Sequence, residues 1–209
     1  MSRPAALVAL LLVFALAAPA WADRPLPAPR QEGGMGVFEA LKKRSSAAGG
    51  DFSPAELSQE ELSNLLWAAS GLNRGQTGWT VPMAHGRPPY CRVYVADKDG
   101  VFLYDWASHS LKEIRSGNIK GDIGAQSFVK KAAAILIFVA DGQALAEFGA
   151  AGEELSHVAA GAMTQNVYLA AAALGLGARY IRSIRQEAVI SALSLPKGDT
   201  PICLMLLGK

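Results

Sequence analysis

Apolar residues recur along this chain in patterns that predict helices and strands in alternation. Helical spacing predicts helices over 37–44, 126–131, 153–176 and 186–193, with a further helix between Ser58 and Gly71. Alternating or continuous apolar runs predict strands over 92–96, 100–104, 133–140, 179–184 and 202–207. This order of elements predicts an α+β domain in which helices wrap a mixed, largely antiparallel central sheet.

Local signals support several of these elements. Ser58 and Glu61 have the spacing of a capping box at a helix start. The turn from Asp97 to Gly100 predicts that the strands beside it form a hairpin. The run over 133–140 is apolar at every position, which is typical of a central strand covered on both faces.

The helix predicted over 153–176 is rich in alanine but carries two adjacent amides, Gln165 and Asn166. Its small side chains permit the close approach of a neighbouring helix. A buried amide without a partner costs about 1–3 kcal/mol. We therefore expect this helix to lie in the core and to pack closely against another helix, from a second subunit or from the same chain, with its amides either bonded to a partner or facing solvent.

Residues 71–89 are rich in glycine, proline and polar side chains and predict a long loop. Long ordered loops in compact domains are usually functional. The backbone amides of this segment would suit contact with a flat ring system. The alternative is an ordinary surface loop, in which His85 alone is weak support for an acid or base.

The first residues have the pattern of a secretory signal peptide. Arg3 is followed by an uncharged apolar run over 5–20 and by small residues around a cleavage point, Ala20-Trp21-Ala22. The run is short for a membrane span, which needs about 20 apolar residues. We therefore expect a signal peptide over 1–22, a linker over 23–32 and a single domain over 33–209. The protein is then periplasmic or secreted and has no membrane association after cleavage.

Charge and composition narrow the function classes. There are 20 Lys and Arg against 18 Asp and Glu, scattered along the chain, so no nucleic-acid partner is expected. The histidines and cysteines lack metal-ligand spacing, so no metal is expected. Cys91 and Cys203 could pair in an exported protein, but both lie in apolar runs that suit buried thiols.

Several short motifs follow one another along most of the chain. Lys43-Arg44-Ser45 follows the first helix, and residues 65–74 read Leu-Leu-Trp-Ala-Ala-Ser-Gly-Leu-Asn-Arg. Residues 165–169 read Gln-Asn-Val-Tyr-Leu. Their order resembles the nitroreductase family, and within it the branch related to the azoline-oxidising dehydrogenases. The resemblance runs from about residue 38 to the end of the chain.

The resemblance implies an FMN-dependent oxidoreductase that acts on a small molecule. It further implies a homodimer with both subunits lining each flavin site. By this resemblance, the phosphate and ribityl chain of the cofactor would contact Lys43, Arg44 and Ser45, and the phosphate would also contact Lys209. The loop that covers the flavin ring would contribute Pro82, Ala84, His85 and Gly86. Arg182 and Ser183 would lie at the reactive edge of the ring.

The ring-covering loop departs from the family pattern. Trp79 and Met83 stand where an Arg and a Ser are expected. In the first motif, Ala47 stands two places after Ser45, where a further basic residue is common. A second hypothesis is therefore a non-catalytic flavin- or ligand-binding protein on the same scaffold. Export also affects the choice of electron donor, because nicotinamide cofactors are not expected outside the cytoplasm. We therefore hypothesise that another reductant reduces the flavin, or that the flavin oxidises a substrate.

Overall fold

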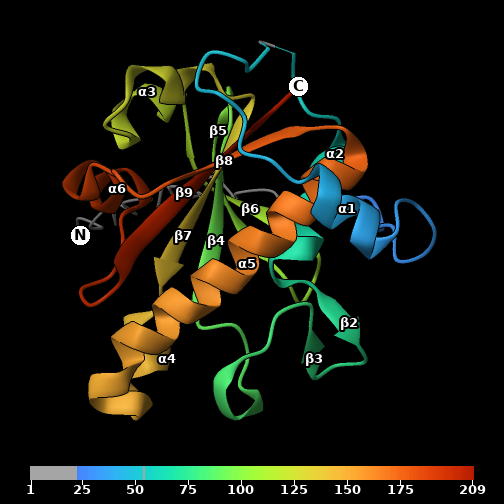
Figure 1. Ribbon diagram of the computed structural model, residues 1–209. Coiled ribbons are helices and arrows are strands. Elements are labelled where there is room, and N and C mark those ends of the chain that lie inside the picture. Colours follow the sequence, from blue (N-terminus) through green and yellow to red (C-terminus); the bar gives the residue numbers. More distant parts are fainter. Residues whose placement is uncertain (1–22, 54) are drawn as a thin grey trace, which may run out of the picture.

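A seven-stranded sheet runs through the centre of the computed structural model, which describes residues 23–53 and 55–209 (Figure 1). Its strands, in spatial order, are β1 (Arg24–Pro25), β6 (Ser110–Ser116), β5 (Gly100–Asp105), β4 (Cys91–Ala96), β7 (Ala134–Ala140), β9 (Thr200–Gly208) and β8 (Gly177–Ile181). Every neighbouring pair in this sheet is antiparallel. The predicted α+β class with a largely antiparallel sheet is confirmed. The predicted signal peptide lies outside the described residues.

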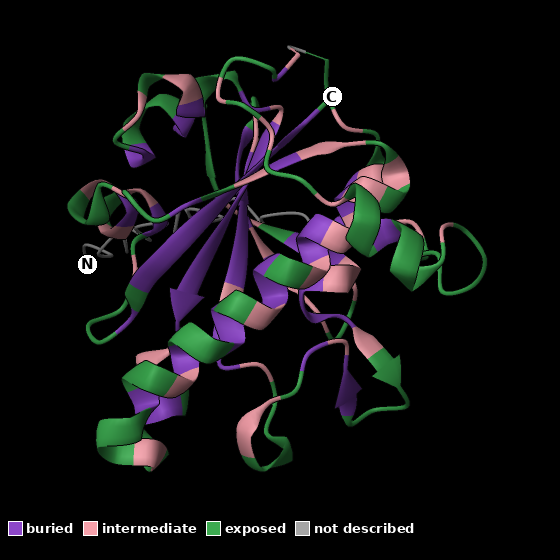
Figure 2. Cartoon of the chain, viewed as in Figure 1, coloured by how far each residue is buried: buried purple, intermediate pink, exposed green. Residues whose placement is uncertain are grey.

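Helices cover both faces of the sheet, and Figure 2 shows the buried strands between them. One face packs against α2 (Gln59–Ser70) and α5 (Gly152–Leu174), and α1 (Val37–Lys43) lies on α5. The other face packs against α3 (Lys120–Ile123), the 3-10 helix η2 (Ser127–Lys131) and α6 (Gln186–Leu193). We call these the α5 face and the α3 face.

Five short elements complete the described chain. A second, two-stranded sheet forms from β2 (Leu72–Arg74) and β3 (Gly78–Trp79). The 3-10 helix η1 (Ala84–Gly86) follows it. Two further short helices, α4 (Gly142–Leu145) and η3 (Ala146–Ala151), lead into α5.

The central strand β7 is buried at every position, between β4 on one side and β9 on the other. Its side chains alternate between the two faces. Leu136 and Phe138 belong to the core under α5, whereas Ile135 and Ile137 belong to the core under α3. Because both faces are covered, the strand is apolar throughout, as the sequence predicts.

The helix boundaries follow from local chemistry. The capping box predicted before α2 is present, since the Ser58 hydroxyl accepts from the Glu61 N–H and the Glu61 carboxylate accepts from the Ser58 N–H. The long helix α5 ends at Gly175, whose left-handed backbone (φ 71°) suits glycine. Helix α6 has the predicted bounds.

The sequence patterns missed the strands at one edge of the sheet. Strand β6 is half-exposed and rich in charge, so its apolar alternation is weak. Its neighbour β1 lies inside the segment predicted to be a linker, where Arg24 pairs with Leu111. The predicted loop over 71–89 likewise contains β2, β3 and η1. Pairing partners distant in sequence create these short strands.

The two cysteines are free and buried. Cys91 lies on β4 and Cys203 on β9, with β7 between them. Strands spaced about 4.8 Å apart place their Cα atoms at least about 9 Å apart, beyond the roughly 7 Å limit for a disulfide. Burial raises the pKa of both thiols, that of Cys203 to about 12, so neither is a reactive thiolate at neutral pH.

No helix in the described part of the chain is both long and apolar enough to cross a membrane.

His109 ties the N-terminal segment to the sheet and to α2. Its Nδ1 lies 2.9 Å from the Tyr104 hydroxyl, and its Nε2 lies 2.8 Å from the Ser63 hydroxyl and 3.1 Å from the Pro27 carbonyl. A neutral ring satisfies this arrangement by donating from Nε2 and accepting at Nδ1 from Tyr104. Burial lowers the pKa of His109 and outweighs the opposite effect of the Pro27 carbonyl.

We expect protonation of His109 to destabilise the fold. The folded-state pKa lies below the ordinary value of about 6.5, so the unfolded chain takes up this proton first. The stability contributed by neutral His109 is fully present above about pH 6.5 and is lost as the pH falls through the folded-state pKa.

Urea denaturation at about pH 7 and about pH 5 tests this linkage. The free energy of unfolding should fall more with acid in the native protein than in His109→Asn, which does not titrate. Asparagine suits the left-handed backbone at this position (φ 48°). Equal losses in the two proteins would contradict the assignment.

Candidate functional site

The segment after α1 carries the first group of predicted cofactor residues. Arg44 ends the helix, where its N–H donates to the Ala40 carbonyl at 2.8 Å. Its guanidinium lies over the ring of Tyr168 on α5, 5.3 Å from the centroid. Lys43 and Ser45 are exposed. The short helix therefore presents two cations and a hydroxyl side by side on the α5 face.

A single buried hydroxyl fixes this segment. The Tyr168 hydroxyl lies 2.8 Å from the Ser46 hydroxyl and accepts from the Tyr180 N–H at 2.8 Å. Two bonds at Ala47 add to it, because its N–H donates to the Ala178 carbonyl and its carbonyl accepts from Arg179. The 44–47 segment is thus held along the start of β8.

This arrangement brings Lys209 to the same end of the sheet. Gly177 of β8 pairs with Gly208 of β9, directly before Lys209. A Cβ at Gly177 would meet the Ala47 Cβ at 3.4 Å, so the segment and the two strand ends lie close together. Segments far apart in the sequence therefore lie at the same end of the sheet, as the predicted phosphate contacts require.

The chemistry of this end of the sheet fits a phosphate group. Lys43 is paired with Glu39 at 2.8 Å and Lys209 with Glu61 at 3.4 Å. The Lys43 pair is exposed and the Lys209 pair is partly exposed, so each contributes only about 0–1 kcal/mol and a bound dianion would compete with the carboxylates for both cations. Arg44 has no ion pair among the described residues, which leaves its guanidinium available as well.

Arg182 and Ser183 lie beyond the other end of β8. Both side chains are exposed. The Ser183 carbonyl accepts from the Ala125 N–H at 3.1 Å, which ties this turn to the α3 side. At about 3.4 Å per strand residue, Arg182 lies roughly 17 Å along the strand from Gly177.

The loop over 80–87 is held to α5 and to η3. Asn166 donates from its side chain to the Thr80 carbonyl at 3.1 Å, whereas Gln165 is exposed, so only one of the adjacent amides has this role. His85 has a left-handed backbone (φ 52°) and stacks on Phe148 at 5.9 Å.

Three of the predicted ring contacts, Pro82, His85 and Gly86, are exposed, and Ala84 is half-buried. They lie near η3, before the start of α5, whereas Arg44 lies beside Tyr168 in the second half of this helix. In Figure 1 the loop after β3 is at the bottom, and the C-terminus is at the top. A single chain therefore brings the phosphate residues together but leaves the ring-covering loop apart from them.

Reasoning from the sequence missed Tyr168 as the organising residue of this site. Helical spacing places it in the core, and it is buried, but its hydroxyl is the point where three segments meet. The requirement that a buried tyrosine hydroxyl find a partner is the signal that could have identified it.

The chain belongs to the nitroreductase family. Residues 41–209 match the model of that family. The crystal structure of a protein assigned as a nitroreductase from Ralstonia eutropha JMP134 is 34% identical. The match covers 90% of this chain and 89% of the other, with a TM-score of 0.84. Membership makes the protein an oxidoreductase by family, as the sequence motifs predict.

Two more distant structures share the fold. The Escherichia coli microcin synthetase complex McbBCD is 17% identical over 98% of this chain and 84% of that chain, with a TM-score of 0.69. A nitroreductase-like protein of Desulfovibrio desulfuricans, solved in complex with FMN, is 24% identical over 82% of this chain and 84% of that chain, with a TM-score of 0.59.

Loss of the Tyr168 hydroxyl should loosen the 44–47 segment. Tyr168→Phe removes the partner of Ser46 and of the Tyr180 N–H, which should cost about 1–2 kcal/mol in the free energy of unfolding. Ser45→Ala removes the exposed hydroxyl next to Ser46 in the sequence, and it should change the free energy of unfolding by no more than about 0.5 kcal/mol. Urea denaturation compares the two, and equal stability would show that the hydroxyl does not anchor the segment.

Proposed function

We propose that the protein is an FMN-dependent oxidoreductase that acts on a small molecule. The observation that carries this proposal is the position of Arg44, Ser45 and Lys209 at the same end of β8 and β9, in a chain of the nitroreductase family. The FMN complex of the Desulfovibrio relative supports the choice of cofactor. When bound, FMN would supply hydride transfer, which no protein side chain can perform.

In this proposal the residues have separate tasks. Arg44, Lys43 and Lys209 neutralise the phosphate, while the Ser45 hydroxyl and the Tyr168-anchored backbone fix its position. Arg182 and Ser183 lie further along β8, toward the reactive edge of the ring. The loop at Pro82, Ala84, His85 and Gly86 excludes water from the ring. The protein thus positions and shields the cofactor, and the small substrate enters beside it.

We infer that two copies of the chain form the site. Apolar side chains are exposed on α1 and α5, among them Phe38, which is 85% exposed, and Val158, which is 65% exposed. An isologous dimer would bury this surface and place the α1 end of one protomer near the η3 end of its partner. That arrangement would bring the ring-covering loop of one chain to the phosphate residues of the other.

We propose export to the periplasm or beyond, on the signal-peptide pattern of residues 1–22. An exported enzyme of this kind would work with a reductant other than NADH or NADPH, or would oxidise its substrate. Cell fractionation and stopped-flow reduction test this. A cytoplasmic protein whose flavin is reduced rapidly by NADH or NADPH would refute the proposal.

A non-catalytic binding protein on the same scaffold is the second candidate. The observation that favours it is Trp79, which stands where the family pattern has an arginine and is buried against Trp106, with ring centroids 5.5 Å apart. This position therefore presents no cation to a flavin. Protein that binds FMN but whose flavin turns over with no electron donor or acceptor would support this second function.

FMN binding is the direct test of the phosphate assignment. Protein supplied with FMN should be yellow and bind one flavin per subunit. Arg44→Ala combined with Ser45→Ala should weaken binding at least tenfold by flavin fluorescence titration, since one charge-assisted contact is worth about 1.5–3 kcal/mol. Lys42→Ala, an exposed cation on the same helix, is the control and should leave affinity within about threefold. Unchanged affinity in the double variant would reject the assignment.

The subunit interface has its own test. Phe38→Asp places a charge in the exposed apolar surface of α1 and should convert the dimer to a monomer in light scattering after gel filtration. Ser191→Asp, an exposed position on α6 at the opposite face of the sheet, should leave the dimer intact. A native protein that is monomeric in the same measurement would refute the proposed interface.

A further inference from the structure

A cavity of about 430 Å³ opens on the α3 side of the sheet and is rich in lysine. Its lining comes from the loop before α2, the β4–β5 turn, α3, and the junction of η2 with β7. The residues are Gly50, Phe52, Glu56, Lys98, Lys120, Lys130, Lys131, Ala132 and Ala133. Four of these nine carry a positive charge and one a negative charge, so the cavity suits an anion.

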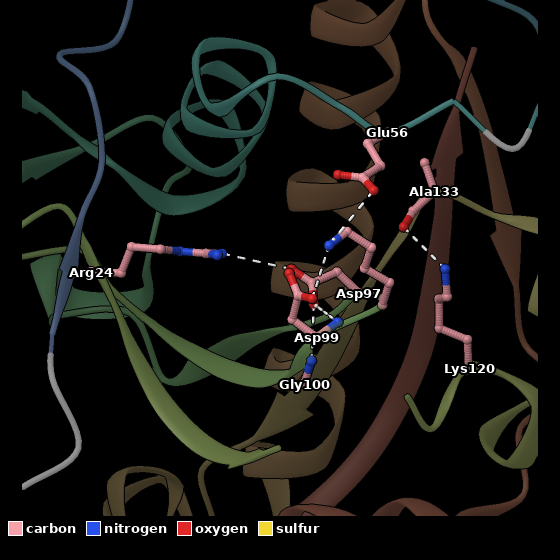
Figure 3. Close-up of polar contacts among 8 residues, drawn as sticks. Arg24, Glu56, Asp97, Asp99, Gly100, Lys120 and Ala133 are labelled. Carbon is pink, nitrogen blue, oxygen red and sulfur yellow. Dashed lines mark hydrogen bonds and ion pairs between the residues drawn. The ribbon is translucent and has the colours of Figure 1, made fainter. Parts of the chain in front are cut away.

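Lys120 is the buried cation of this cavity. Only 7% of it is exposed, and its Nζ donates to the Ala132 carbonyl at 2.7 Å. It also donates to the Ala133 carbonyl at 3.2 Å, and Figure 3 shows this second bond. Among the described residues it has no carboxylate within ion-pair distance. An ammonium group has three protons to donate, and two are used here. Burial lowers the pKa of Lys120, so a nearby anion would offset the desolvation of its charge.

The other charges leave an excess of positive potential. Glu56 pairs with Lys98 at 3.7 Å, Lys98 also contacts Asp99 at 2.9 Å, and Asp97 pairs with Arg24 at 3.6 Å (Figure 3). These three acids outnumber their two cations by one, which offsets only part of the charge of Lys120, Lys130 and Lys131. Lys130 and Lys131 are exposed at the end of η2 and have no ion pair in the described part of the chain. The remaining excess of about two positive charges exceeds what a monovalent anion would neutralise.

We propose that this cavity binds the phosphate group of a small molecule, at a site separate from the proposed cofactor site. Lys120 forms the floor, and Lys130 and Lys131 close over the charge from the rim. Phe52 separates the two sites, because its ring packs against Gly208 and Gly177 at the strand ends. Lysine binds phosphate as a point charge, which suits a ligand recognised by charge rather than by shape.

An NMR titration of the whole protein with inorganic pyrophosphate, at fixed ionic strength and with FMN already present at saturation, tests the site. The largest amide shifts should fall on residues 130–133 and on Gly50. Lys130→Gln combined with Lys131→Gln should raise Kd at least tenfold. The charge-matched control, Arg74→Gln with Lys197→Gln, alters two exposed residues outside the cavity and should stay within twofold.

The outcomes separate this site from the cofactor site. Shifts centred on residues 44–47, or equal weakening in both double variants, would overturn the proposal. The pyrophosphate result does not depend on flavin binding, so a protein that fails to bind FMN but shows these shifts refutes only the proposed function.

A second arm distinguishes a soluble phosphate from a lipid headgroup. The protein is sedimented with phosphatidylcholine vesicles that contain or lack phosphatidic acid. Co-sedimentation that requires phosphatidic acid and is lost in Lys130→Gln with Lys131→Gln assigns the phosphate to a lipid. Pyrophosphate binding without co-sedimentation assigns it to a soluble molecule. If the protein neither binds pyrophosphate nor sediments with the phosphatidic acid vesicles, the proposed site is refuted.

Discussion

The burial of β7 on both faces is the constraint on which the rest of this fold depends. A strand with no exposed residue requires a neighbour on each side and a helical layer above and below. Here β4 and β9 provide the hydrogen bonds, α2 and α5 cover one face, and α3, η2 and α6 cover the other. Burying one such large apolar side chain contributes about 1.5–3 kcal/mol, so this strand supplies much of the drive for folding.

Two layers of helix give the protein two chemically different faces. On the α5 face, the Tyr168 hydroxyl and the backbone bonds of Ala47 hold the 44–47 segment against β8, and Lys43, Arg44 and Lys209 lie near the strand ends. On the α3 face, short helices bring lysines around a cavity whose floor is a buried ammonium group. The sheet separates the two, and the exposed apolar side chains of α1 and α5 belong to the first face alone.

The structure places the predicted site residues in separate groups, and each placement has a physical reason. Lys43, Arg44, Ser45 and Lys209 lie at one end of the sheet because Gly177 pairs with Gly208 and Ala47 bonds to Ala178. The loop at Pro82 to Gly86 lies instead beside Phe148 of η3, before the start of α5, whereas Arg44 lies beside Tyr168 in the second half of that helix. Position along the chain gave no indication of this separation, since it depends on where α5 begins and ends in space.

The sequence by itself determined the class of fold, the long helix, the central strand and the family, because apolar periodicity, capping residues and short motifs are local properties. It also indicated which segments carry cations and hydroxyls. Only the tertiary structure decided that β1 and β6 complete the sheet, that the cysteines stay apart, and that Tyr168 joins three segments. It alone placed Lys120 beside Lys130 and Lys131. These outcomes depend on pairings between residues distant in the chain, which no local pattern encodes.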